Sequence, residues 1–230
     1  MRRYSSYSYG YNNPIRFIDP DGMMPFDEYY DIFGKKLGVD ESGINGNVKI
    51  VQNQKEIDLI KQNTKKGTFT HSSLVTTDLS TSKTVLAEAL NVLDRTVGLK
   101  EEGSTVAKDG VVARMPSGNG VVENLNGVEI SSIDISIPKG TDNTSIHSHI
   151  MDVSTNEKGQ KVSMRASKPG PNDPNVFKHF LQNIIVGNLS LPTYDNGVLI
   201  KPVTGAVFYG QSNRPIIELE RQIIKKIIKP

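Results

Sequence analysis

The chain has 230 residues, of which 36% are hydrophobic and 23% are charged, and its formal net charge is +2. This size and composition predict one good core with appendages. The small net charge does not indicate nucleic acid as an obligatory partner, and no apolar run of signal-peptide or membrane-spanning length predicts stable membrane insertion. The chain has no cysteine, which excludes disulfide frameworks, thiolate metal sites and cysteine nucleophiles. Any bound metal must therefore be held by histidine and carboxylate side chains.

Residues 1–23 differ in composition from the rest of the chain. They are rich in Tyr, Asn and Pro and end in the turn-forming run Asp-Pro-Asp-Gly-Met. The stretch from Pro14 to Met23 resembles the C-terminal end of the Rhs core of bacterial polymorphic toxins, matching its Pro-x-x-x-x-Asp-Pro-x-Gly terminus. The resemblance implies a remnant of the Rhs core over residues 1–23, with Asp19 at its cleavage motif, followed by a toxin domain over residues 24–230. Because the upstream shell is absent, we do not expect self-cleavage.

In the first half of the domain, the sequence predicts elements to which we assign no catalytic or binding role. Residues 50–51 indicate a strand and residues 56–60 a short helix. Residues 80–97 carry apolar side chains at helical spacing after Ser82, which predicts a packing helix.

The second half changes to a pattern of short strands separated by Gly and Asn turns. We expect strands at residues 104–106, 110–113, 127–130, 133–137, 144–147, 198–200 and 205–209. Asp173 is predicted to cap a helix that runs to about Val186 and ends at Gly187 and Asn188. The tail from Pro215 has the pattern of an amphipathic helix docked on its own core. Together these elements predict an α+β fold with a mixed sheet flanked by helices.

Half of the four histidines lie in one motif, His147-x-His149, on a predicted strand. Residues at i and i+2 of a strand face the same side, so both imidazoles could reach one metal ion. With Asp173 as a third ligand, one coordination position would stay open, as in catalytic zinc sites. The alternative is a pair of half-exposed polar residues on a strand. His71 and His179 are expected to be structural or solvent-facing.

This order of a helix, a glutamate-bearing strand, a His-x-His strand and an aspartate at a helix start resembles the JAMM/MPN (JAB-like) metalloprotease family. The family pattern is a glutamate some tens of residues before His-x-His-Pro, followed by Ser-x-x-Asp. The resemblance implies a layered, cytidine-deaminase-like fold with Zn²⁺ held by His147, His149 and Asp173. Glu101 fits the family's Glu-x-Gly spacing and would be the general base, and Glu102 is the alternative.

Three features depart from the family pattern. Ile150 replaces the proline after His-x-His, and Gly170 occupies the position of the motif serine. The gap before the aspartate is also longer, which an inserted hairpin around residues 156–159 would explain. Ser167 or Ser148 could take the role of the missing serine.

The resemblances imply a zinc-dependent hydrolase of peptide or isopeptide bonds that acts as the C-terminal toxin of an Rhs-type effector. It would lack its own signal peptide, act on a protein substrate in the cytoplasm of the target cell, and have a cognate immunity protein. Two alternatives stay open. One is a metal-dependent nuclease toxin, although residues 141–157 contain three acidic residues and no Lys or Arg for a phosphate-binding surface. The other is a non-catalytic JAB-like binding domain.

Overall fold

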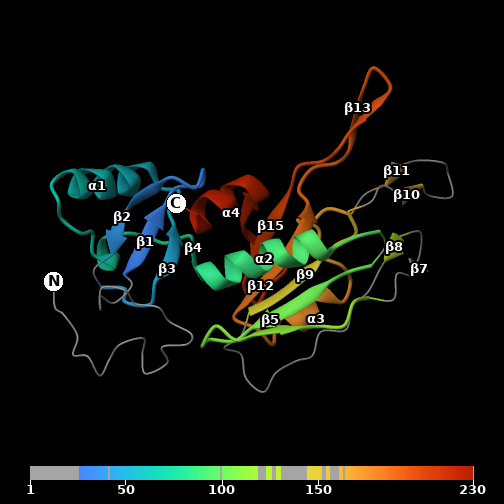
Figure 1. Ribbon diagram of the computed structural model, residues 1–230, viewed down its shortest axis with the longest axis horizontal. Helices are drawn as coiled ribbons and strands as arrows, with labels where there is room; N and C mark the ends of the chain where they lie inside the picture. Colours follow the sequence, from blue (N-terminus) through green and yellow to red (C-terminus); the bar gives the residue numbers. More distant parts are fainter. Residues whose placement is uncertain are drawn as a thin grey trace. The chain divides into compact units, whose positions relative to one another are not determined.

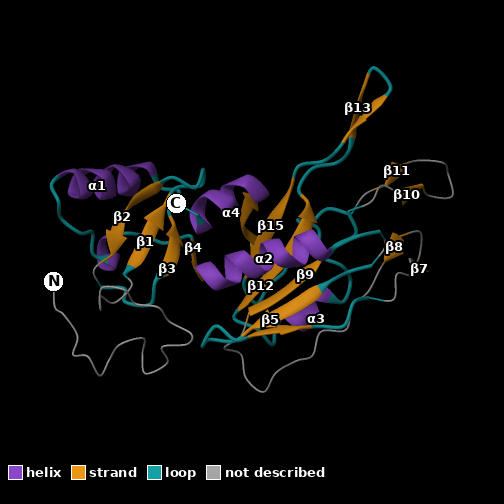
Figure 2. Ribbon diagram, viewed as in Figure 1, coloured by secondary structure: helices purple, strands orange, loops and turns teal. Residues whose placement is uncertain are grey.

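The computed structural model describes residues 26–40, 42–98, 100–118, 123–125, 128–130, 144–151, 154–155, 161–162 and 164–229. The chain divides into two compact units, Met1–Lys83 and Thr84–Pro230. Each unit contains a mixed, open β-sheet with helices, so the predicted α+β class is confirmed (Figures 1 and 2). The expected Rhs remnant over residues 1–23, its boundary with residue 24 and the expected strand over residues 133–137 lie outside the described residues.

The first unit is built on a four-stranded sheet in the order β2-β1-β3-β4. Strand β1 pairs parallel with β3, and the other neighbours pair antiparallel. Its elements are β1 (Asp27–Tyr30), β2 (Lys36–Asp40), β3 (Asn47–Ile50), α1 (Gln54–Lys65), the 3-10 helix η2 (Ser72–Leu74) and β4 (Leu79–Ser82). The predicted strand near residue 50 and the predicted helix over residues 56–60 are thus both present.

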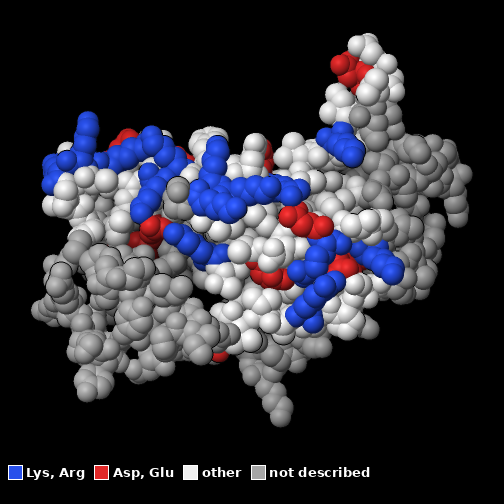
Figure 3. All heavy atoms as spheres, viewed as in Figure 1, with Lys and Arg blue, Asp and Glu red and all other residues white. Residues whose placement is uncertain are grey.

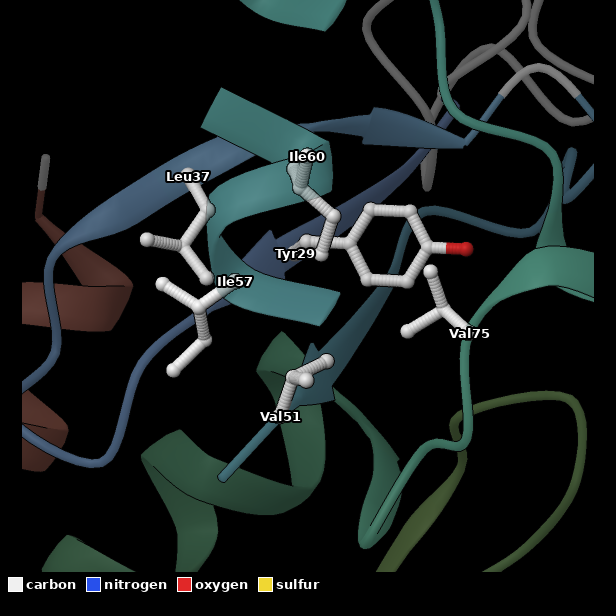
Figure 4. Close-up of a cluster of buried hydrophobic side chains, with 6 residues drawn as sticks. All are labelled: Tyr29, Leu37, Val51, Ile57, Ile60 and Val75. Carbon is white, nitrogen blue, oxygen red and sulfur yellow. The ribbon is translucent and has the colours of Figure 1, made fainter. Parts of the chain in front are cut away.

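A cluster of apolar side chains joins α1 to this sheet. Asn53 caps α1 by accepting a hydrogen bond from the backbone of Lys55, and the buried Ile57 and Ile60 lie one helical turn apart. Figure 4 shows the cluster, which consists of Tyr29, Leu37, Val51, Ile57, Ile60 and Val75. Burying each large aliphatic side chain stabilises the fold by about 1.5–3 kcal/mol, so this unit has a core of its own.

The second unit is built on a six-stranded sheet in the order β16-β15-β12-β9-β5-β6. Only β9 and β12 pair parallel, and the other neighbours pair antiparallel. The strands are β5 (Gly103–Val106), β6 (Val112–Arg114), β9 (Thr144–Ser148), β12 (Gln182–Asn188), β15 (Thr204–Tyr209) and β16 (Pro215–Glu220). A parallel pair requires a crossover connection, so the chain between β9 and β12 must return along a face of the sheet.

Among the described residues of the second unit, three two-stranded ribbons lie outside the main sheet. They are β7 (Glu123–Leu125) with β8 (Val128–Ile130), β10 (Ser154–Thr155) with β11 (Lys161–Val162), and β13 (Thr193–Asp195) with β14 (Val198–Ile200). Strands β10 and β11 flank residues 156–159, where the hairpin before the aspartate is predicted.

Helices cover both faces of the six-stranded sheet. Helices α2 (Lys83–Arg95) and α4 (Arg221–Ile228) lie on one face, joined by an ion pair of 2.6 Å between Arg221 and Asp94 (Figure 1). Lys and Arg side chains gather on the exposed side of α4 (Figure 3). Helix α3 (Asp173–Phe177) lies on the opposite face, where Phe177 packs in a buried cluster with side chains of β12 and β15. The crossover from β9 to β12 therefore runs through α3.

Two predicted helices are shorter than expected. The helix starting at Asp173 ends at Phe177, and residues 182–188, including Gly187 and Asn188, form β12 instead. The reason is that Ile184, Ile185 and Val186 are apolar, β-branched and all buried, as is typical of a central strand covered on both faces. Residues 215–220 likewise form β16 before α4 begins, because buried and exposed side chains alternate there with period two.

The predicted packing helix over residues 80–97 is present as α2, although it begins later than expected because residues 80–82 belong to β4. The predicted strands in the regions of residues 104–106, 110–113, 127–130, 144–147, 198–200 and 205–209 are also present, with small shifts of their ends. Within the described part of the chain, none of the helices combines the length and apolar character needed to cross a membrane.

Candidate metal centre

His147 and His149 lie at the carboxyl end of β9, near the middle of the six-stranded sheet. His147 is the fourth residue of the strand, and His149 follows its last residue. The backbone N–H of His149 donates to the carbonyl of Val186 on β12, which continues the parallel pairing beyond the strand end. Both residues are 2% exposed. The alternative of two half-exposed polar residues is therefore wrong for this pair.

Asp173 approaches both histidines from the crossover. Its Oδ1 lies 3.4 Å from Nε2 of His147, and its Oδ2 lies 3.4 Å from Nε2 of His149. One ligand atom from each of the three residues lies within 4.8 Å of the others, which is compact enough for all three to hold one metal ion. The predicted set of three metal-binding side chains is thus brought together, although it comes from two segments far apart in the sequence.

The surroundings of the ring nitrogens of both imidazoles suit the binding of a metal ion. Nδ1 of His149 lies 3.0 Å from the carbonyl oxygen of Arg165, which leaves Nε2 directed toward Asp173. For His147, neither ring nitrogen makes a regular hydrogen bond in the described structure, and Nε2 has only the 3.4 Å contact with Oδ1 of Asp173. Buried polar atoms without a partner are rare in folded proteins. A metal ion bound to Nε2 of His147 would satisfy one of the two nitrogens, so the residues fit such a group.

The electrostatics of the cluster also favour the binding of a cation. Burial opposes the imidazolium, but the Asp173 carboxylate outweighs burial, with a further contribution from Glu101, so the pKa of His147 is raised. Burial likewise opposes ionisation of Asp173, but the two imidazoles outweigh it and hold the pKa of that carboxyl far below its usual range. The site therefore has a negative potential that favours a cation, either a proton on His147 or a metal ion.

The two candidate glutamates lie on different faces of the sheet. Gly103 is paired directly with His147, so residues 101 and 103 share the face of the metal cluster, whereas residues 102 and 104 face α2. Glu101 is 4% exposed, and its charge acts on His147. The carboxylate of Glu102 instead lies 3.1 Å from Nη2 of Arg114 and accepts a hydrogen bond from Ser117.

A polar network on the α2 face was not predicted from the sequence. Glu88 is buried and accepts hydrogen bonds from Ser104 at 2.6 Å and from Arg95 at 3.0 Å. Nε of Arg95 also lies 3.8 Å from Glu102, so the network connects α2 to the start of β5. The signal was available, because Glu88 follows Val85 by three residues and so belongs to the apolar face of the helix.

The structure shows the contacts or the burial of the residues that depart from the JAMM pattern and of the two serines that could replace the missing one. The backbone N–H of Gly170 donates to Oδ2 of Asp173 at 2.7 Å, so this residue still contacts the aspartate without a hydroxyl. Ile150 is buried. The hydroxyl of Ser148 accepts from the backbone N–H of Glu102 at 2.8 Å and lies on the sheet face away from the histidines. Ser167 is partly buried in the loop after Arg165, and its role stays a prediction.

Two further expectations concern residues outside the cluster. His71 and His179 are exposed, as predicted, and His71 caps η2 by accepting from the backbone of Ser73. Asp173 lies at the start of a helix, as predicted, but the prediction that it caps this helix is wrong, because it is the first residue of α3. Asn172 occupies the cap position, without a side-chain hydrogen bond. The Asp173 carboxylate is instead directed to the histidines.

Comparisons of the chain with protein-family models, with curated proteins and with solved structures found no match.

Proposed function

We propose that the chain is a zinc-dependent hydrolase of peptide or isopeptide bonds, with a JAMM-like fold in its second unit. The observation that carries the proposal is the buried cluster of His147, His149 and Asp173, in which neither nitrogen of His147 has a hydrogen-bond partner among the described residues. Two imidazoles and one carboxylate are a ligand set typical of catalytic zinc, which keeps one position open. When bound, zinc would polarise the scissile carbonyl and make water easier to deprotonate.

Glu101 is the residue of this chain best placed to act as the general base. It shares the sheet face of His147, it is buried, and its charge influences that histidine. It would accept a proton from the attacking water and deliver it to the leaving nitrogen. Glu102 is not suited to this role, since its carboxylate is engaged by Arg114 and faces α2. We assign Glu102 to fixing the start of β5, because its backbone N–H and carbonyl both bond to Ser148.

The biological setting that we propose is that of a toxin. The Rhs-like sequence between Pro14 and Met23 supports an effector that acts in the cytoplasm of a target cell, with an immunity protein that protects the producing cell. The proposal treats residues 1–23 as a remnant of the Rhs core. Expression of the chain in a bacterial cytoplasm should then inhibit growth, and Glu101→Gln should abolish the inhibition.

The biochemical test uses two probes with the zinc-loaded full chain. One is a peptide library from a digested bacterial proteome, in which new amino termini report peptide-bond cleavage. The other is a set of peptides acylated on the lysine side chain by a second peptide, which reports isopeptide cleavage. Cleavage by the wild type that is lost in both His149→Ala and Glu101→Gln supports the proposal. Cleavage in neither library, with zinc still bound, would favour the non-catalytic alternative.

One observation keeps a metal-dependent nuclease as a second candidate. The loop that contacts His149 carries Arg165 and Lys168, both with exposed side chains, and such cations can bind phosphate groups. They come from outside residues 141–157, where the sequence shows no basic residue. Incubating the metal-loaded chain with single-stranded and double-stranded DNA and RNA distinguishes the candidates, because only a nuclease would shorten these substrates.

A further inference from the structure

We infer that Tyr209, on β15, is a positioning residue of the metal centre, which fixes the loop carbonyl that sets the tautomer and orientation of His149. The inference rests on the proposed metal site, and it names a residue that is not one of the three predicted ligands. The loop in question, residues 164–170, passes over the α3 face of the sheet beside the carboxyl ends of β9 and β12.

The contact between His149 and Arg165 determines the tautomer of His149. A carbonyl oxygen can only accept, so at 3.0 Å from the Arg165 oxygen the Nδ1 of a neutral His149 must carry the proton. Nε2 then has a free lone pair, and it is this nitrogen that faces Asp173. Bonds of this kind fix the ring orientation and the basicity of metal-binding histidines. The position of the Arg165 carbonyl is therefore important for the metal centre.

The two peptide groups on either side of Ala166 are each held by a hydrogen bond to a strand. The N–H of Ala166 donates to the carbonyl of Asn188 on β12 at 2.8 Å. The hydroxyl of Tyr209 donates to the carbonyl of Ala166 at 2.7 Å. Ala166 and Tyr209 are both completely buried, so water cannot replace these bonds. Loss of the Tyr209 hydroxyl would leave a buried carbonyl without this donor, one residue from the group that orients His149.

Tyr209 also contacts the segment that carries Asp173. Its ring packs against Phe177 with a centroid distance of 5.1 Å and a tilt of 35°. Phe177 ends the short helix α3 that begins at Asp173. Burial raises the pKa of the Tyr209 hydroxyl above its ordinary value, and the charges of Glu218 and Asp173 raise it further. The hydroxyl is therefore a permanent donor, and the side chain contacts both the loop that orients His149 and the helix that begins with Asp173.

The test compares Tyr209→Phe with the matched variant Tyr30→Phe. Tyr30, in the first unit, is also a buried tyrosine whose hydroxyl donates one hydrogen bond, to Glu28 at 2.8 Å. Nitrogen-15 NMR of the metal-free chain at alkaline pH reads the tautomer of each of the four imidazoles. The signals of His149 are identified by their loss in His149→Ala. We expect the Nδ1–H tautomer in the wild type and in Tyr30→Phe, and a mixture of tautomers in Tyr209→Phe.

Zinc affinity is the second measurement on the same proteins. We expect Tyr209→Phe to weaken zinc binding about 10–100-fold, as is typical for loss of an outer partner of a metal ligand, and Tyr30→Phe to leave it unchanged. Equal tautomer populations and equal zinc affinities in the two variants would overturn the inference. A wild-type His149 with its proton on Nε2 would also overturn it, and that result requires no variant to fold.

The two proposals fail in different ways. If the wild type binds no zinc, the proposed function fails, while the tautomer comparison still decides the role of Tyr209. If zinc binds tightly and peptides are cleaved but Tyr209→Phe matches the wild type in tautomer and affinity, only the role of Tyr209 is lost.

Discussion

Gly103 on β5 lies directly opposite His147 on β9, so both residues face the same side of the six-stranded sheet. The hydrogen bond from the N–H of Ser148 to the carbonyl of Glu102 continues this register before the start of β5. Because side chains alternate along an extended segment, Glu101 belongs to the face of His147 and Glu102 to the face of α2.

This relationship predicts different effects for two neighbouring substitutions. Glu101→Gln should lower the hydrolysis rate about 10²–10⁴-fold, because it removes the general base, and zinc should stay bound. Glu102→Gln removes the partner of Arg114 on the other face, so it should cost about 1–3 kcal/mol in the free energy of unfolding and affect the rate far less. Cleavage rates, zinc content and urea unfolding of the two variants provide the comparison. A larger loss of rate in Glu102→Gln would contradict the assignment.

Metal binding should stabilise the fold. Zinc at 100 times its dissociation constant adds about 2.7 kcal/mol to the free energy of unfolding, so a chelator should lower the melting temperature of the wild type by several degrees. His147→Ala and His149→Ala should lose bound zinc and should no longer respond to the chelator. His179→Ala is the matched control, because this histidine is exposed and lies outside the cluster. Its zinc content and its response to the chelator should equal those of the wild type.

The metal-free protein should have a distinctive dependence on pH. The pKa of His147 is raised from its ordinary 6.5, so its contribution to stability is fully present below pH 6.5 and is lost as the pH rises through the raised value. The pKa of Asp173 is lowered from its ordinary 3.8, so its contribution is present above pH 3.8 and is lost as the pH falls toward the lowered value. Without metal, the stabilisation from this pair should therefore be greatest between about pH 4 and 6.5.

Asp173→Asn tests this account. The variant removes the charge that favours a protonated His147, so its free energy of unfolding at pH 6 should be lower by about 1–3 kcal/mol. The stability decline above pH 6.5 should also disappear. Urea unfolding in the presence of a chelator, at a series of pH values, measures both effects. A variant that keeps the wild-type pH profile would show that the ion pair does not contribute to folding.

The metal ligands could be predicted from the sequence because their signal is local. The i, i+2 spacing of His147 and His149 on a strand is sufficient to place both imidazoles on one face. Asp173 is marked by the Asp-Pro sequence at a helix start. The helix α2 is similarly evident from the spacing of its apolar side chains. In each case a few neighbouring residues determine the structure.

The features that the sequence did not reveal depend on contacts between distant segments. Residues 182–188 have an apolar run that suits a buried helix or a buried strand, and only pairing with β9 and β15 decides for the strand. The choice between Glu101 and Glu102 depends on the register of β5 against β9, which a shift of one residue would reverse. The carbonyl of Arg165 carries no side-chain signal at all, so its contact with His149 could not be expected.

The last prediction concerns Asn183, which secures the short helix α3. Its side-chain amide is completely buried and donates to the carbonyls of Phe177 at 3.1 Å and Gly210 at 2.8 Å. Its Oδ1 accepts from the hydroxyl of Ser145, two residues before His147. A helix of five residues is not stable alone, so this junction keeps Asp173 next to β9. Asn183 therefore links β9, which carries His147, to α3, which carries Asp173. It does so at the far ends of these two elements from the metal cluster.

Asn183→Ala should leave several buried carbonyls without this donor and lower the free energy of unfolding by about 3 kcal/mol. The same variant should bind zinc at least tenfold more weakly, because Asp173 loses its fixed position. Asn63→Ala is the control, since Asn63 donates one side-chain bond, to Thr70 at 3.0 Å, in the first unit. It should cost about 1 kcal/mol and leave zinc binding unchanged. Urea unfolding and zinc titration of the two variants distinguish an effect on the position of Asp173 from an effect on stability alone. A loss of stability in Asn183→Ala with full zinc affinity would leave this residue a purely structural role.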